Sequence, residues 1–180
     1  MSNWTEMGEE VKGKLKRCGR EVKIYPMAKI IKPEVIELGD YSRFCDFTFI
    51  YGGKGIKIGR YVGIGFFVSI TGGGELVIGD YAAIAVGSRI ITGTETYYGG
   101  KRMCATLPQE QRNVMLGKVV IEKDAFIGAN VVVHPNVTIG EGAIIGSNSL
   151  VLKDIEPWSI NVGSPCRKIG ERPRVVVPDI

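Results

Sequence analysis

The sequence predicts an all-β fold, a parallel β-helix of triangular cross-section, and two observations lead to this prediction. Residues 121–152 repeat in units of six, each unit starting with an aliphatic residue and carrying a small or β-branched residue four positions later. This period matches neither an amphipathic helix nor an alternating strand, and a fixed short repeat is typical of a solenoid. We therefore expect one short strand on each side of the triangle, with an aliphatic side chain pointing inward. The aliphatic positions are Ile121, Ile127, Val133, Ile139, Ile145 and Val151.

The same series runs through the first half of the chain, where we place its start at Leu38. The steps from Ile50 to Ile58 and from Ile70 to Ile78 are eight residues instead of six. One turn of the triangle is therefore 20 residues there and 18 residues later. Both insertions are Gly-rich and fall at the third side, so they should bulge from one edge, where solenoids often carry a binding face. The series reads Leu38, Phe44, Ile50, Ile58, Ile64, Ile70, Ile78, Ile84 and Ile90.

Two segments depart from the repeat. Residues from about Thr5 to Cys18 place Met7, Val11 and Leu15 on one apolar stripe, which predicts a short helix. Residues 92–118 are polar and contain no hexad, and a long segment of this kind in a compact domain is usually functional or disordered. We expect it to project as a loop. The predicted parts are an N-terminal helical segment (1–23), the β-helix (24–160) and a C-terminal segment with its tail (161–180).

Composition limits the classes of function. A chain of 180 residues is one domain, long enough for a substantial core. The formal charge of +4 suits small acidic ligands such as phosphates and is too mild to indicate nucleic-acid binding. Four scattered cysteines without a CxxC pair argue against a zinc site or a disulfide framework and favour a reducing compartment. Because no long apolar run is present, we expect a cytoplasmic protein without an integral membrane segment.

A second motif lies in the C-terminal segment, where residues 163–169 read G-S-P-C-R-K-I. Gly-Ala at 128–129, Gly-Ser-Asn-Ser at 146–149 and Lys-Asp at 153–154 accompany it. Together with the hexads, these motifs resemble the hexapeptide-repeat acyltransferases, in particular the galactoside and maltose O-acetyltransferase-like sugar acetyltransferases. The resemblance covers about residues 36–172. It implies a left-handed β-helix that forms homotrimers, with the projecting loop walling the active site against a neighbouring subunit.

The resemblance also implies acetyl-CoA as the acyl donor, without a metal. The small residues Ala129 and Ser147 match positions where the pantetheine arm approaches the β-helix. Lys153 and Arg167 match the cations that meet the phosphates of coenzyme A. Ammonium and guanidinium groups suit phosphate, so the residue types agree with this role.

The catalytic centre departs from the family pattern. An ungapped alignment with the galactoside-type enzymes places their catalytic histidine at Glu95, and a substrate-binding asparagine at Gly65. An ordinary glutamate is a weak base at neutral pH, so Glu95 could replace the histidine only if burial made it more basic.

Three further residues are candidates for the site. His134, the only histidine, is either structural or a base that reaches the site of a neighbouring chain, and a single histidine argues against a three-histidine metal site. Asp46 is a candidate for holding an acceptor amine or hydroxyl. Tyr97, beside Glu95, could stack on a sugar ring or simply pack the loop.

The function that the resemblance implies is acetyl transfer from acetyl-CoA to a sugar or nucleotide-linked sugar, in surface polysaccharide biosynthesis. The acceptor group stays open at this point, because a hydroxyl needs a base whereas a neutral amine is already nucleophilic. The alternative is a non-catalytic β-helix, a binding or scaffold protein whose acyltransferase site has decayed at Glu95 and Gly65.

Overall fold

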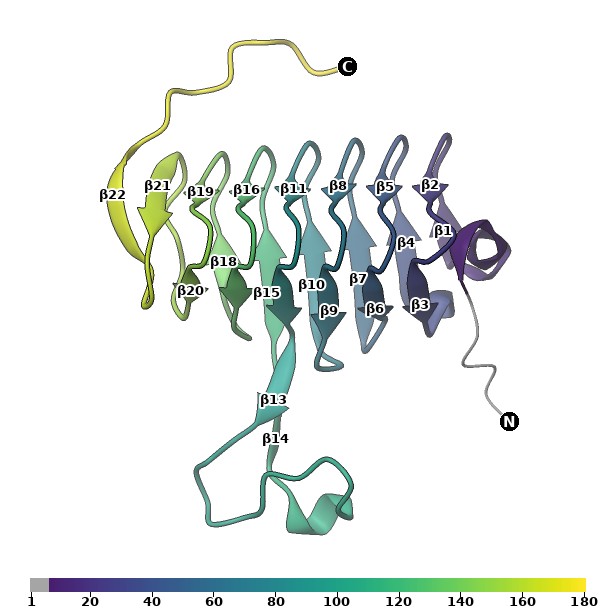
Figure 1. Cartoon of the computed structure of the whole chain (residues 1–180), viewed down its shortest axis with the longest axis vertical. Helices are drawn as coiled ribbons and strands as arrows, with labels where there is room; N and C mark the ends of the chain where they lie inside the picture. The colour runs from purple at the N-terminus through teal and green to yellow at the C-terminus, as the bar shows by residue number, and fades with distance from the viewer. Residues whose placement is uncertain (1–6) are drawn as a thin grey trace.

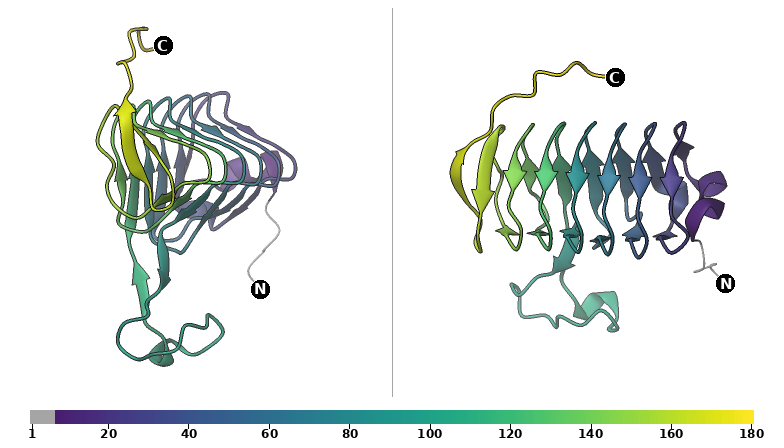
Figure 2. Two further views of the ribbon diagram at one scale, coloured as in Figure 1. Left: turned by 60° about the vertical axis from the view of Figure 1, so that its left-hand side comes forward. Right: turned by 45° about the horizontal axis from the view of Figure 1, so that its top comes forward.

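The computed structural model describes residues 7–180 and shows a left-handed parallel β-helix, in which successive coils stack along one axis (Figure 1). Seen nearly along that axis, the coils form a triangular prism (Figure 2, left). Each coil gives one short strand to each of three sheets, and the strands pair in register with the coils on either side. The predicted fold class is thereby confirmed; Thr5, where the predicted helix begins, lies outside the described residues.

We number the sheets in the order in which the chain visits them. Sheet 1 contains β1 (Arg17–Cys18), β4 (Ile36–Leu38), β7 (Gly55–Ile58), β10 (Glu75–Ile78), β15 (Lys118–Ile121) and β18 (Thr138–Ile139). Sheet 2 contains β2 (Lys23–Ile24), β5 (Arg43–Phe44), β8 (Gly63–Ile64), β11 (Ala83–Ile84), β16 (Phe126–Ile127), β19 (Ile144–Ile145), β21 (Ser159–Val162) and β22 (Arg167–Glu171). Sheet 3 contains β3 (Lys29–Ile31), β6 (Phe49–Tyr51), β9 (Ser69–Thr71), β12 (Arg89–Ile91), β17 (Val132–Val133) and β20 (Leu150–Val151). The prism edges are named 1/2, 2/3 and 3/1 after the sheets that they join.

The aliphatic series forms the core. Every residue of the series from Leu38 to Val151 is buried, and Ile127 and Ile145 are 0% exposed. Ile58 pairs with Ile78 and Ile121 pairs with Ile139, which gives coils of 20 residues in the first half and 18 in the second, as predicted.

The N-terminal segment differs from the prediction. The helix is a 3-10 helix, η1 (Gly8–Lys14), and the chain is already extended in β1, where Cys18 pairs with Leu38. Gly8 and Gly13 weaken an α-helix in this short segment. Ile24 and Ile30 are buried and pair with Phe44 and Ile50, so the repeat begins one coil earlier than Leu38.

All departures from the hexad repeat gather on the 3/1 edge. The short 3-10 turn η2 (Pro33–Val35), the two Gly-rich insertions and the projecting loop lie there one above another. The loop leaves the prism as an antiparallel hairpin of β13 (Gly93–Glu95) and β14 (Val114–Leu116), and its outer part holds the 3-10 turn η3 (Gln109–Gln111) (Figure 1). At the hairpin root a Cβ on Gly72 would lie 2.2 Å from the nitrogen of Gly93, so the coils touch there only because both residues are glycine. The predicted projecting loop is confirmed.

The 1/2 edge carries charges of alternating sign on successive coils. The Asp40 carboxylate accepts hydrogen bonds from the Arg20 backbone N–H (2.9 Å) and Nε (3.0 Å). Asp80 binds Arg60 in the same way, at 2.8 and 3.0 Å. In register order this column reads Arg20, Asp40, Arg60, Asp80, Lys123 and Glu141.

Candidate active site

Glu95 lies at the end of β13, where it is bound by Arg112 from the other side of the hairpin. The Arg112 Nε donates to Oε1 of Glu95 at 2.8 Å, and its Nη2 donates to the same oxygen. The Nη1 of Arg112 donates to the carbonyl of Ala105 at 2.9 Å, so this guanidinium ties the outer loop to the hairpin. Only 16% of the Glu95 side chain and 21% of the Arg112 side chain are exposed.

The second carboxylate oxygen of Glu95 has no hydrogen-bond partner. Among the described residues, Oε2 is the buried side-chain oxygen that no donor reaches. Leaving a buried polar atom unpaired costs about 1–3 kcal/mol, and such an atom in a native structure usually marks a functional site. Oε1 is already engaged by Arg112 and Oε2 is covered, so in this conformation Glu95 offers no free lone pair to a substrate.

Arg112 is the residue that sequence reasoning missed. It is 17 positions from Glu95 and stands in a segment without hexads, so no periodicity connects the two. Opposite charges across a suspected hairpin were the one available signal.

His134 and Tyr97 lie on the same edge as Glu95 without joining it. His134 follows β17 at the 3/1 edge, half-buried, and its backbone N–H donates to the carbonyl of Val151 at 3.0 Å. It occupies the position that Ile91, at the hairpin root, holds in the coil before. Tyr97 is 74% exposed on the loop, and its hydroxyl donates to that of Tyr98 at 3.2 Å.

The remaining small and acidic candidates lie on the 2/3 edge. Asp46 accepts the backbone N–H of Met27 at 2.8 Å, which fixes the turn of the coil before. A Cβ on Gly65 would lie 3.0 Å from two backbone atoms of the next coil. Ala129 and Ser147 are brought together, since the Ala129 N–H donates to the Ser147 hydroxyl at 3.1 Å. The structure therefore places the candidates on two edges of the prism, and sheet 3 separates them.

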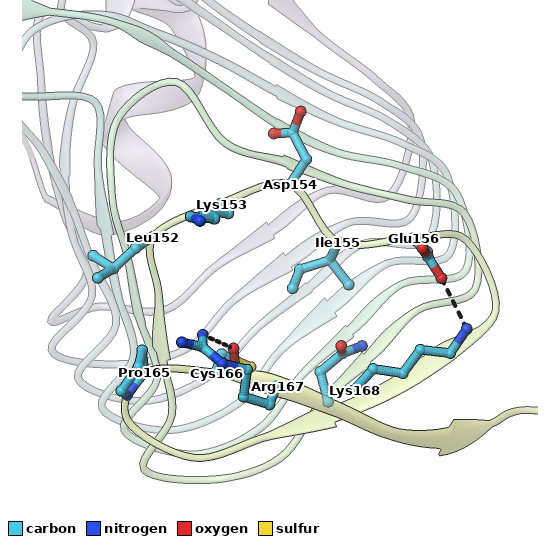
Figure 3. Close-up of a pocket in the computed structure, with 10 residues that line it drawn as sticks. Leu152, Lys153, Asp154, Ile155, Glu156, Pro165, Cys166, Arg167 and Lys168 are labelled. Atoms are coloured by element: carbon cyan, nitrogen blue, oxygen red, sulfur yellow. Dashed lines mark hydrogen bonds and ion pairs between the residues drawn. The ribbon is translucent and has the colours of Figure 1, made fainter.

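The last coil contains a cavity of about 530 Å³ that brings together the two predicted phosphate-binding cations (Figure 3). Lys153 enters it from the turn after β20, and Arg167 enters it from the start of β22. Its lining includes Leu152, Lys153, Asp154, Cys166, Arg167 and Lys168.

Lys153 and Arg167 are the cations of this cavity without a carboxylate partner among the described residues. Lys168 is paired with Glu156 and Glu171, whose hydrogen bonds raise the pKa of Lys168 to about 12. Arg167 donates only to the carbonyl of Cys166, at 2.8 Å. Two uncompensated cations in one cavity make it suitable for a phosphate-bearing ligand.

Cys166 is the partly buried thiol of this cavity, and burial raises its pKa. Among residues 7–180, no cluster of three His, Cys, Asp or Glu side chains could hold a metal ion. Within the same residues, no helix has the length and apolar character needed to cross a membrane.

Comparison with known proteins identifies the class. Residues 118–153 match the family model described as bacterial transferase hexapeptide (six repeats). The chain is 37% identical over 159 residues to a dTDP-4-amino-4,6-dideoxy-D-glucose acyltransferase of Escherichia coli, covering 87% of this chain and 82% of that protein. The chain belongs to the hexapeptide-repeat acyltransferases.

Solved structures agree with this assignment. The N-acyltransferase AntD from Bacillus cereus, in complex with dTDP and 3-hydroxybutyryl-CoA, superposes with a TM-score of 0.87 at 34% identity. The superposition covers 97% of this chain and 92% of AntD. A single-residue variant of AntD, with the same TM-score of 0.87, is in complex with dTDP-4-amino-4,6-dideoxyglucose and coenzyme A.

Proposed function

We propose that this enzyme transfers an acyl group from acyl-CoA to the amino group of a nucleotide-linked amino sugar. The observation that carries the proposal is the 37% identity over 87% of the chain to an acyltransferase named for a dTDP-linked 4-amino sugar. The amine nitrogen attacks the thioester carbonyl to give a tetrahedral intermediate. The C–S bond then breaks, an amide forms, and the proton lost by nitrogen leaves with the coenzyme A thiolate.

An amine acceptor agrees with the state of Glu95. A hydroxyl acceptor needs a base in the transition state, and the candidate base has one oxygen bound by Arg112 and the other covered. A neutral amine is nucleophilic without help and loses its proton after attack. Glu95 then serves to hold the hairpin, and its unpaired Oε2 can receive a donor when the loop shifts or a second chain arrives. His134 stays the alternative base from a neighbouring chain.

For the donor, we propose that Lys153 and Arg167 bind the phosphates of coenzyme A in the last-coil cavity. Their lack of a carboxylate partner among the described residues supports this role. Ala129 and Ser147, stacked at the 2/3 edge, leave room for the pantetheine arm.

We also propose a homotrimer with the active site between chains. The candidate residues occupy two edges of one prism, and a neighbouring copy would bring the 2/3 edge of one chain beside the 3/1 edge of the next. Large apolar side chains are exposed around these edges: Phe47 and Phe67, stacked at 4.9 Å, are 51% and 58% exposed, and Leu152 is 47% exposed. Asp46, Gly65 and Tyr97 would then line the acceptor side. We place the product in surface polysaccharide biosynthesis and the enzyme in the cytoplasm.

The test is acyl transfer followed by release of free thiol and by mass spectrometry of the product. Acetyl-CoA and 3-hydroxybutyryl-CoA are offered with dTDP-4-amino-4,6-dideoxyglucose, and the matched control acceptor carries a hydroxyl in place of the amine. We expect an N-acyl product with the amino sugar and little turnover with the control. Equal turnover of both would refute the preference for an amine. No turnover with either, although coenzyme A binds, would favour a non-catalytic scaffold.

A further inference from the structure

A groove on the outer surface of sheet 2 spans the first three coils, away from the hairpin and the last-coil cavity. Its volume is about 370 Å³. β2, β5 and β8 form its floor, and the 1/2 edge forms one wall. Its polar and aromatic lining consists of Glu21, Lys23, Tyr25, Tyr41, Arg43 and Tyr61.

Two cations of the same sign stand side by side on the floor of this groove. Lys23 and Arg43 are register partners on adjacent parallel strands, so their backbones are about 4.8 Å apart. Among the described residues, neither side chain has a hydrogen bond or an ion pair. Like charges opposite each other on neighbouring strands are destabilising. The arrangement is unusual in this protein, because Arg20 and Arg60 each bind an aspartate of the next coil.

The walls supply hydroxyl groups and open space. Tyr41 and Tyr61 stack on each other at 4.8 Å with an interplanar angle of 11°, so they present ring edges and hydroxyls to the groove. The next position on the floor is Gly63, where an added Cβ would meet nothing within 4 Å. Glu21 is the one acid of the lining, against two cations.

The third rung of the tyrosine column shows how the protein satisfies similar groups. The hydroxyl of Tyr81, which stacks on Tyr61, donates to the Ile180 backbone oxygen at 2.8 Å. Beside it, Lys123 binds both carboxylate oxygens of Asp179, at 2.8 and 2.7 Å. The C-terminal tail thus brings an anion to the tyrosine and cation of this rung, whereas the rungs of Tyr41 and Tyr61 carry no such anion.

We propose that the groove over Lys23 and Arg43 is a binding site for a phosphate-bearing anion. A phosphate or diphosphate group between the two cations would replace their repulsion by charge-assisted hydrogen bonds, and the tyrosine hydroxyls would donate to its remaining oxygens. A planar base cannot intercalate between Tyr41 and Tyr61, so recognition falls on the phosphate. The site goes beyond the proposed function, since sheet 2 lies opposite the 3/1 edge that carries the hairpin. The phosphate comes either from a nucleotide or from a free inorganic anion.

The experiment follows the backbone amides of Lys23, Arg43 and Gly63 by NMR while coenzyme A is kept saturating. Inorganic pyrophosphate, dTDP and thymidine are titrated in turn. We expect the three amides to shift with pyrophosphate or dTDP and not with thymidine. Lys23→Gln and Arg43→Gln should each weaken this binding at least about tenfold, as expected for loss of a charge-assisted contact. Lys54→Gln, an exposed cation outside the groove, should not.

The arms separate the outcomes. Equal binding of pyrophosphate and dTDP assigns the site to free phosphate anions, and binding of dTDP alone assigns it to a nucleotide. Absence of shifts at the three amides, or shifts that persist unchanged in both variants, overturns the proposal. Acyl transfer is measured in parallel. Groove variants that lose anion binding and keep turnover leave the proposed function intact, whereas a wild-type protein that binds anions and lacks turnover refutes only that function.

Discussion

Replacing Arg112 by methionine should loosen the projecting hairpin without unfolding the β-helix. Arg112 makes two charge-assisted hydrogen bonds to Glu95 and one to the Ala105 carbonyl, and its loss would leave neither oxygen of a largely buried carboxylate paired. Breaking a fully buried ion pair costs about 3–5 kcal/mol. Because roughly a fifth of each side chain is exposed, we expect about 2–3 kcal/mol here.

Hydrogen exchange measures this loss directly. The N–H of Thr96 is bonded to the carbonyl of Asn113 at 2.8 Å across the hairpin, and that of Phe126 to Ala143 at 2.8 Å within the prism. A loss of 2–3 kcal/mol should speed exchange at Thr96 about 30- to 150-fold and leave Phe126 unchanged. Lys101→Met, an exposed cation of the same loop, is the matched control. Unchanged exchange at Thr96 in the Arg112 variant would refute the idea that this ion pair holds the hairpin.

The same variants separate an anchoring Glu95 from a catalytic one. If Glu95 only holds the hairpin, Glu95→Gln and Arg112→Met should reduce acyl transfer to a similar extent, within about tenfold. General-base losses are larger, about 10²–10⁴-fold. A loss of that size in Glu95→Gln, with hairpin exchange unchanged, would make Glu95 the base and contradict the anchoring role.

The remaining predictions concern the core, the donor cavity and the thiols. Ile145→Ala should lower the free energy of unfolding by about 2–5 kcal/mol in urea denaturation, because this side chain is fully buried between rigid coils, whereas Ile169→Ala, 65% exposed, should have little effect; similar losses for the two would contradict the register. Arg167→Ala should weaken coenzyme A binding about 10- to 100-fold in calorimetry, with a smaller change for dephospho-coenzyme A if the contact is to the 3′-phosphate, and unchanged affinity for both would reject the assignment. A hydrogen bond with Thr106 lowers the pKa of Cys104, whereas burial raises the pKa of Cys166. A lower pKa means more thiolate at neutral pH, so iodoacetamide should label Cys104 first, and coenzyme A should slow labelling of Cys166 only; faster labelling of Cys166 would contradict this order.

The β-helix was predictable because its interior admits one large side chain per side of the triangle. That restriction writes the series from Leu38 to Val151 into the sequence with a period of six, and the coil lengths of 20 and 18 follow from the spacing alone. The first coil was missed, although Ile24 and Ile30 are in phase, because Pro26 and Pro33 interrupt it and the preceding apolar stripe suggested a helix.

The candidate site was predictable where it depends on residues close to the repeat. Lys153 and Arg167 were expected to act together, and they line one cavity. Their motif positions are fixed by the last coil. The partner of Glu95 was not predictable, because Arg112 reaches it across a hairpin whose shape no periodic pattern describes. The placement of Asp46 on a different edge from Glu95 follows from the three-sided section, which separates residues on different edges of every coil.

The alternating charges on the 1/2 edge restrict how the length of this protein can change. Deleting one coil, residues 40–59, would leave the core series in phase and yet set Arg20 against Arg60, replacing an attraction by a repulsion. Deleting two coils, residues 40–79, would set Arg20 against Asp80 and restore the pair. The hydrophobic interior therefore tolerates growth or loss by single coils, whereas this column of charges favours growth or loss by two.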